Sequence, residues 1–216
     1  MNNKGFTLIE LIVVMSVFML IVAVAIAIFL SIISSQRRIL AQEQMLSQVS
    51  YAMEYMSKGL RMAQKDEDGV CLVHTDSNGE VTQSFPGYMY LYTRPDSQTS
   101  VYKGIKFINA SNNAACQEFF LDDGDTGNNT IKELKDSTSN NDASLLTADK
   151  YNINYFRYSI NGGSGLSSEG IYGASEDNTL QPRITIIMGF ELPGDETQPE
   201  IRIQTTVSQR NLNASQ

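Results

Sequence analysis

The order of apolar and polar positions first marks out an uninterrupted apolar run near the amino terminus. From Leu11 to Ile33 no residue carries a charge, and only Ser16 and Ser31 have hydroxyl groups. Because a helix rises about 1.5 Å per residue, this run is long enough to cross the hydrocarbon core of a bilayer. A helix that is apolar on every side belongs in a membrane or in a large core. A chain of 216 residues has no core of that size, so the pattern predicts a membrane-spanning helix.

A cleaved secretory signal peptide is the alternative interpretation of this run. Lys4 precedes the run, and Ala23–Ala25 and Ala25–Ala27 fit the small-residue pattern of a cleavage site. The run nevertheless continues well beyond those alanines to Ile33, and Glu10 adds a charge that is of no use to a signal peptide. These two features favour a retained span.

Beyond Ser35 the apolar positions lie on one side of a predicted helix. They recur every three or four residues, which is the period of a single helix face. They are Leu46, Val49, Met53, Met56, Leu60 and Ala63, with Ile39 one heptad earlier. Because no proline occurs before Pro86, one helix from Phe6 to Gln64 is allowed. We interpret the stripe as one edge of a globular core, with a coiled-coil seam as the alternative.

A minor strip lies on another side of the same predicted helix. It consists of Tyr51, Tyr55 and Met62. The strip either contacts neighbouring subunits or consists of scattered surface residues.

From Val70 onward the apolar period becomes two, which predicts β-strands. Two segments around Asn78-Gly79 read as a hairpin. The predicted strands are Val70–Thr75, Glu80–Phe85, Tyr88–Thr93, Val101–Ile108, Cys116–Leu121, Tyr151–Ile160, Ile184–Leu192 and Ile201–Val207. A long helix followed by strands predicts an α+β fold, in which the helix packs on a mostly antiparallel sheet.

Composition limits the chemistry of this chain. The net charge of −8 argues against a broad nucleic-acid-binding surface, so DNA is not an expected partner, although a local patch stays open. One histidine, His74, and two cysteines leave little material for a His/Cys metal site or a Ser-His-Asp triad. No enzyme activity is therefore predicted.

The most specific motif surrounds Gly5. A short polar leader, Met1–Gly5, is followed by Phe6, and Glu10 stands at the start of the apolar run. A carboxylate at the centre of a span costs about 2.5–3.5 kcal/mol, and less near the interface. The apolar run contains no Lys or Arg to pair with it. The stretch Gly5-Phe6-Thr7-Leu8-Ile9-Glu10-Leu11 resembles the processing motif of type IV prepilins and of type II secretion pseudopilins.

The resemblance implies how the amino terminus is processed. A prepilin peptidase would cut after Gly5 and methylate the new amino group of Phe6. In a filament, the Glu10 carboxylate of one subunit would neutralise the Phe6 amine of a neighbour and set the register between them. A charge pair in low dielectric attracts strongly, whereas either charge alone is costly there. The alternative is that Glu10 only reaches back to the membrane interface.

The resemblance also implies the pilin fold and its division along the chain. Residues 1–5 would be the leader peptide, 6–38 the transmembrane stem helix, 39–65 its amphipathic half, and 66–216 a globular β-rich head. The leader would be cytoplasmic and the head outside the inner membrane, and the subunit would later enter a pilus or pseudopilus. Arg37 and Arg38, directly after the span, depart from a simple positive-inside expectation.

A looser similarity connects the carboxy-terminal half to the larger minor pilins, of the W-type and J-type pseudopilin groups. It covers Leu146–Lys150, which leads into a strand, and the ending Ile201–Leu212. It implies a minor pilin at the filament tip, acting as initiator or cargo contact. The alternatives are a major pilin, although the stem lacks the kinking proline of many of these, and a membrane-anchored extracytoplasmic binding module or enzyme. The implied partners are prepilin peptidase, other pilins, an inner-membrane platform protein and an assembly ATPase.

Cys71 and Cys116 both stand at the beginning of predicted strands. In an oxidising compartment such a pair readily forms a disulfide. Two buried free thiols, or a metal or redox role, are the alternatives.

The segment from Asp122 to Asn129 is rich in oxygen ligands suited to calcium. Counted from Asp122, Gly127 falls sixth and Glu133 twelfth, a partial match to a calcium-binding loop. The third place is Gly124, which has no side-chain oxygen, so a solvated turn is the simpler interpretation. Calcium stays open because some pseudopilin heads bind it, and no other cofactor is predicted. The candidate ligands are Asp122, Asp123, Asp125 and Glu133.

Overall fold

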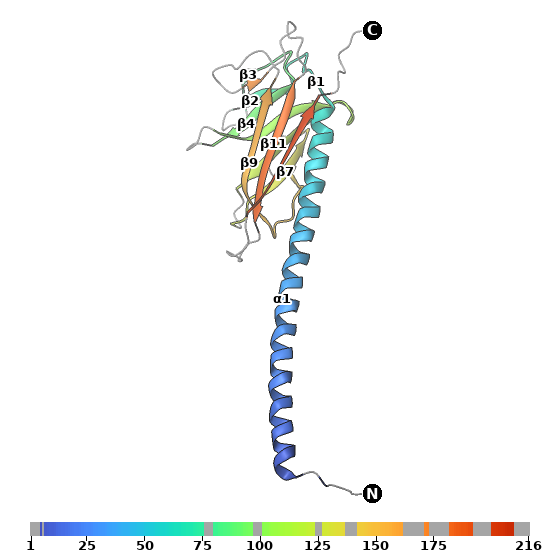
Figure 1. Ribbon diagram of the computed structural model, residues 1–216. Helices are drawn as coiled ribbons and strands as arrows, with labels where there is room; N and C mark the ends of the chain where they lie inside the picture. The colour runs from blue at the N-terminus through green and yellow to red at the C-terminus, as the bar shows by residue number, and fades with distance from the viewer. Residues whose placement is uncertain are drawn as a thin grey trace. The chain divides into compact units, whose positions relative to one another are not determined.

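The computed structural model describes residue 5 and residues 7–75, 80–96, 101–123, 127–136, 142–161, 171–172, 182–191 and 200–209. The chain divides into two compact units, residues 1–47 and 48–216. In the described residues there is one helix, α1, from Leu8 to Arg61, and all strands follow it along the chain (Figure 1).

Helix α1 begins directly after Thr7, whose carbonyl oxygen accepts hydrogen bonds from the backbone N–H groups of Glu10 and Leu11 at 3.1 and 3.3 Å. The predicted start at Phe6 lies outside the described residues. The helix ends at Arg61, three residues before the predicted end at about Gln64, because Ala63 and Gln64 form strand β1. There the backbone pairs with strand β5 instead of closing another helical turn.

The strands form two sheets and a hairpin, and every pairing is antiparallel. The larger sheet has the order β10-β4-β5-β6-β7-β8, with β1 also paired to β5, the smaller sheet has the order β12-β11-β9, and β2 pairs with β3. Their bounds are β1 Ala63–Gln64, β2 Val73–Thr75, β3 Val81–Ser84, β4 Tyr90–Pro95, β5 Tyr102–Asn109, β6 Ala115–Asp122, β7 Thr130–Lys135, β8 Ser144–Leu145, β9 Asn152–Asn161, β10 Ile171–Tyr172, β11 Arg183–Glu191 and β12 Ile201–Ser208. The predicted α+β fold with antiparallel sheets is confirmed, and it is consistent with the pilin fold.

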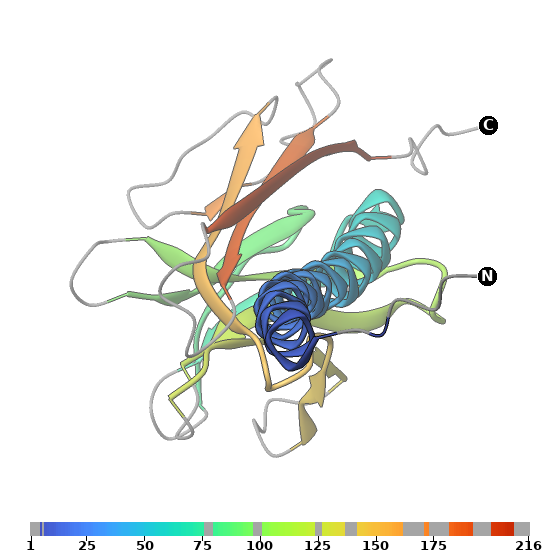
Figure 2. The ribbon, with the colours of Figure 1, turned by 60° about the horizontal axis from the view of Figure 1, so that its bottom comes forward.

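The last turns of α1, from residue 48 onward, contact both sheets (Figure 2). Toward the larger sheet, a Cβ atom built on Gly59 would lie 3.3 Å from the ring carbons of Phe107 and Phe119. Toward the smaller sheet, the Tyr158 hydroxyl lies 3.8 Å from the Met56 sulfur. Glycine at position 59 therefore lets the helix approach β5 and β6 closely.

The predicted apolar stripe is buried over most of its length. Its buried members are Val49, Met53, Met56, Leu60 and Ala63. The side chains of Leu46 and Ile39 are 37% and 51% exposed, whereas Met45 is 1% exposed. The buried face therefore begins at Met45 instead of Ile39 or Leu46.

Most predicted strands appear with shifts of one or two residues, and β11 pairs with β12 as an antiparallel hairpin, with Ile186 opposite Thr205. The predicted hairpin around Asn78-Gly79 is β2–β3, and its turn lies outside the described residues. Strand β7 was not predicted, because its polar residue Glu133 faces the interior and breaks the apolar alternation.

Candidate functional site

The amino-terminal motif begins with Gly5, which is exposed and has no neighbouring atom within 4 Å of a Cβ built on it. Phe6, the predicted first residue of the mature chain, lies outside the described residues. Glu10 lies in the first turn of α1 and is exposed. A carboxylate there interacts favourably with the positive end of the helix dipole, and among the described residues no basic side chain lies within ion-pair distance of it.

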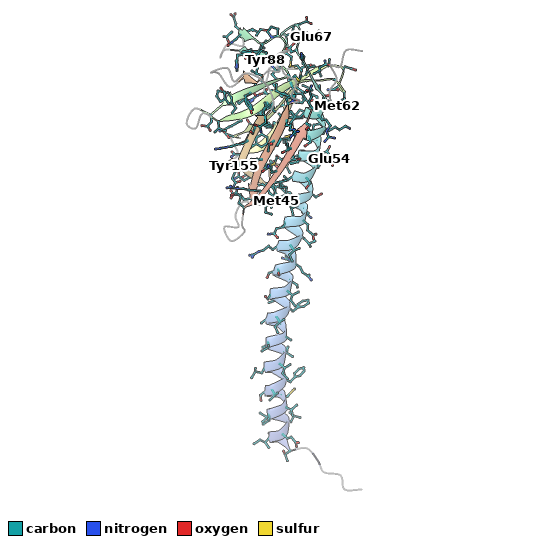
Figure 3. All side chains as sticks on the ribbon, turned by 45° about the horizontal axis from the view of Figure 1, so that its top comes forward. Met45, Glu54, Met62, Glu67, Tyr88 and Tyr155 are labelled. Carbon is teal, nitrogen blue, oxygen red and sulfur yellow. A yellow bond between two sulfur atoms is a disulfide. The ribbon has the colours of Figure 1, made fainter. Side chains whose placement is uncertain are left out.

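Exposed apolar side chains lie on both sides of Glu10 along α1. The large apolar side chains of α1 from Leu8 to Ile32 are exposed and project on all sides of the helix, as Figure 3 shows. Phe18, for example, is 57% exposed and Leu20 68%. By length and composition this stretch of α1 can cross a membrane. Soluble monomers rarely expose apolar surface of this extent, so the segment requires lipid or other protein around it.

The cysteines are joined in the structure. The sulfur atoms of Cys71 and Cys116 lie 2.05 Å apart and their Cα atoms 5.5 Å apart. The bond connects the turn that follows β1 to the first residues of β6. It closes a loop with a sequence separation of 45.

The candidate calcium ligands are engaged by other groups. Lys132 lies 2.5 Å from the Asp122 carboxylate, and Lys103 lies 2.6 Å from the Asp123 carboxylate. Glu133 is buried and takes part in a separate cluster, and Asp125 lies outside the described residues. Among the described residues, no three His, Cys, Asp or Glu side chains come together as a metal site. Calcium binding stays a prediction that these ion pairs disfavour.

The buried cluster around Glu133 was missed by sequence analysis. The Tyr55 hydroxyl, from α1, donates to both Glu133 carboxylate oxygens at 3.0 and 3.2 Å. The Gln117 amide, from β6, also donates to Glu133, and the Asn109 amide donates to Gln117 at 2.7 Å. The only signal in the sequence was a glutamate between the apolar residues Ile131 and Leu134, and a glutamate there fits a calcium loop equally well.

Lys135 completes this cluster at its exposed end. Its ammonium lies 3.0 Å from the Tyr55 oxygen and 3.2 Å from the Glu133 carboxylate. The hydrogen bond to Tyr55, and after it the Glu133 carboxylate, raise the pKa of Lys135 although partial burial opposes this. Both oxygens of the buried carboxylate therefore accept hydrogen bonds. Because the donors lie on α1, β6 and β7, the cluster connects the helix to these two strands. Tyr55 is therefore half-buried and bonded to strands of the head, so it is not a free surface residue.

Comparison with known proteins gives one match. Residues 1–34 match the family model described as a prokaryotic N-terminal methylation motif. No curated protein and no solved structure matches the chain. The matched segment contains Gly5, Phe6 and Glu10 and most of the exposed apolar surface. The match supports a type IV pilin-like, structural subunit, and together with the apolar helix it suggests association with a membrane and assembly with other pilins.

Proposed function

We propose that the chain is a minor pilin or pseudopilin, a structural subunit that leaves the membrane and enters a helical filament. The observation that carries this proposal is the apolar surface between Leu8 and Ile32, which is exposed on all sides in the single chain and lies within the segment that matches the methylation motif. Lipid covers such a surface before assembly, and the stems of other subunits cover it afterwards.

Processing prepares the chain for this transfer. Prepilin peptidase removes the leader up to Gly5 and methylates the amine of Phe6. The absence of a side chain at Gly5 leaves its carbonyl open to a protease. The new positive amine then stands four residues before Glu10 along the chain.

The Glu10 carboxylate then directs assembly. Its charge is costly in an apolar filament core unless a cation pairs with it. The Phe6 amine of a neighbouring subunit is such a cation, and pairing the two fixes the axial position of one stem against the next. A cytoplasmic ATPase, acting through a platform protein, supplies the energy of extraction.

We assign the subunit to the tip of the filament because of its large head. Residues 48–216 form a large unit with two sheets and a hairpin. A head of this size has more space at the tip of a filament than at a repeating position along the shaft. This assignment also rests on the similarity of the carboxy-terminal half to larger minor pilins.

Mass spectrometry of the mature amino terminus tests the proposal. The full chain is co-expressed with a prepilin peptidase, and a mature protein that begins with methylated Phe6 is expected. Gly5→Leu is the matched control, and it should leave Met1 or Asn2 at the amino terminus. A wild-type protein that retains its leader, or that begins near Ile26 or Ile28, contradicts the proposal.

A further inference from the structure

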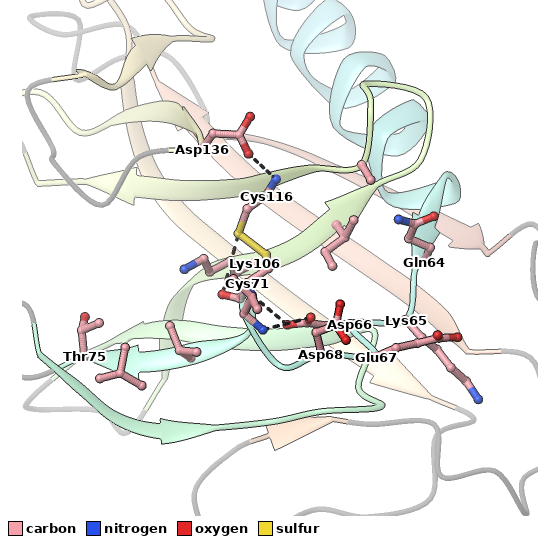
Figure 4. A pocket seen from close by; sticks show the side chains of 15 residues that line it. Gln64, Lys65, Asp66, Glu67, Asp68, Cys71, Thr75, Lys106, Cys116 and Asp136 are labelled. Carbon is pink, nitrogen blue, oxygen red and sulfur yellow. Dashed lines mark hydrogen bonds between the residues drawn. A yellow bond between two sulfur atoms is a disulfide. The ribbon is translucent and has the colours of Figure 1, made fainter.

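A cavity of about 810 Å³ opens beside the Cys71–Cys116 disulfide (Figure 4). Its walls come from separate parts of the head, namely the end of β1 and the turn after it, the hairpin β2–β3, and strands β5 and β6. This volume lies in the range of sites that hold small organic molecules.

Polar contacts hold the walls of this cavity in place. The Asp66 carboxylate is 2% exposed and accepts hydrogen bonds from the backbone N–H groups of Val70, Cys71 and Leu72 at 3.2, 2.9 and 2.6 Å. On the opposite wall, the Asp136 carboxylate accepts from the Cys116 N–H at 2.7 Å. The disulfide then joins the two walls. A site that is already ordered loses little entropy when a ligand binds.

Lys106 brings a positive charge to this cavity. It lies on β5 between Leu91 and Glu118 of the neighbouring strands, and Figure 4 shows its side chain beside the disulfide. Burial lowers the pKa of Lys106, and the more distant Glu118 and Asp66 carboxylates only partly offset this. Among the described residues, no carboxylate lies within ion-pair distance of its ammonium.

The two carboxylates that raise the pKa of Lys106, those of Glu118 and Asp66, accept hydrogen bonds from other groups. Glu118 accepts hydrogen bonds from Thr93 at 2.6 Å and from Arg94 at 2.9 Å. Asp66 holds the three backbone N–H groups of the adjacent turn. A partly desolvated ammonium without a contact partner is unfavourable, and an anion that enters the cavity would relieve this cost.

The other residues that line the cavity include aliphatic side chains and two acids. Its apolar side chains are Val70, Val73, Val81 and Ile108. Val70 and Val81 are 77% and 60% exposed, which leaves aliphatic surface available to a ligand. Glu67 and Asp68 lie in the same lining and disfavour a second negative charge.

We propose that this cavity binds a small monocarboxylate with an aliphatic portion. The carboxylate pairs with the Lys106 ammonium, and the aliphatic portion covers Val70, Val73, Val81 and Ile108. Two sources share this chemistry, a free aliphatic acid and the carboxy-terminal residue of a polypeptide. The site is independent of the stem helix and of filament assembly.

Calorimetric titration of the full chain in lipid nanodiscs tests this site. The probes are 4-methylpentanoate and the peptide acetyl-Gly-Gly-Val with a free carboxyl group, and empty nanodiscs correct for partition into lipid. We expect saturable binding of at least one probe, and the stronger probe identifies the source of the carboxylate. The uncharged 4-methylpentanamide and the amidated peptide should not bind.

Lys106→Met should weaken binding at least about tenfold, the size of one lost charged contact. Lys58→Met is the matched control, because it removes the same charge from an exposed helix position and should leave binding unchanged. Val81→Ser should weaken binding of 4-methylpentanoate but not of acetate. Thermal unfolding of Lys106→Met should occur at or above the wild-type temperature, because no ion pair is lost.

Two results overturn the proposal. One is that neither probe binds the wild type saturably at concentrations up to about 10 mM, which would mean a dissociation constant above the millimolar range. The other is equal affinity of the wild type and Lys106→Met for the probe that binds.

Discussion

The two ends of α1 differ in the exposure of their apolar side chains. From Leu8 to Ile32 the large apolar side chains are exposed on all sides, whereas from Val49 to Leu60 one apolar face is buried. The head completes its own core with that face. The first part has nothing within its own unit to cover it. The difference shows that the head folds by internal contacts, while the amino-terminal part depends on other molecules.

The charged residues of the two ends show the same contrast. Glu133 is 3% exposed and receives hydrogen bonds from Tyr55 and Gln117. Glu10 has no basic side chain within ion-pair distance among the described residues. A buried carboxylate is tolerated where its own chain supplies the donors. Glu10 is exposed, and in the proposed function its partner is the amine of another subunit.

The largest expected effect comes from Glu10→Val. This variant should be processed at Gly5 and inserted in the membrane like the wild type, but it should be absent from sheared filaments, because it can no longer pair with a neighbouring amine. Immunoblots of the filament and membrane fractions measure this. Glu10→Asp is the control, and it should retain part of the incorporation. Normal incorporation of Glu10→Val would show that the first part of α1 assembles by apolar contacts alone.

The next largest effect concerns the disulfide of the head. Replacing both Cys71 and Cys116 by serine should lower the free energy of unfolding by about 4 kcal/mol, since a loop with a sequence separation of 45 is no longer closed. Urea unfolding of the full chain in detergent, followed by near-ultraviolet circular dichroism, measures the change. Wild-type protein that has been reduced serves as the control and should unfold like the double variant. An unchanged midpoint would mean that the core alone sustains the head.

Gly59→Val tests the close approach of the helix to β5 and β6. The new side chain would collide with the rings of Phe107 and Phe119, so a loss of about 1–3 kcal/mol is expected from overpacking. Lys58→Val is the matched control, because it places the same β-branched residue at the adjacent exposed position. Equal losses of unfolding free energy for the two variants would refute a packing role for Gly59.

Tyr55→Phe should have the smallest effect of the four. It removes the hydroxyl that donates to Glu133 and leaves the ring against Phe119. The expected cost is about 1 kcal/mol, because Gln117 and Lys135 still bond the carboxylate. Tyr51→Phe is the control, because Tyr51 is exposed and should tolerate the change. If both variants unfold at the same urea concentration, the cluster around Glu133 does not attach the helix to the sheet.

Much of this architecture is visible in the sequence. The charge-free run from Leu11 to Ile33 indicates the apolar helix. A helix without a polar side is suited to a membrane or to a large protein core, and this chain has no such core. Strict alternation indicates β11 and β12, because a strand with one buried face repeats every two residues. The motif around Gly5 is local and is therefore readable without a fold.

Other features depend on residues far apart in the chain. Glu133 looked like a calcium ligand because the sequence does not show that Tyr55 and Gln117 reach it from α1 and β6. Helix propensity does not reveal that Ala63 and Gln64 leave the helix, because their partners on β5 decide it. The sequence also does not show that Met45 is buried and Leu46 is 37% exposed.

The sequence by itself determined the processing motif, the apolar stem and the α+β class, because each rests on the order of neighbouring residues. Only the tertiary structure decided which groups face one another. It placed Glu133 among donors in the interior of the head, and it placed Lys106 without a contacting carboxylate beside the disulfide. Side chains brought together by strand pairing are distant along the chain, so their chemistry is defined only after folding.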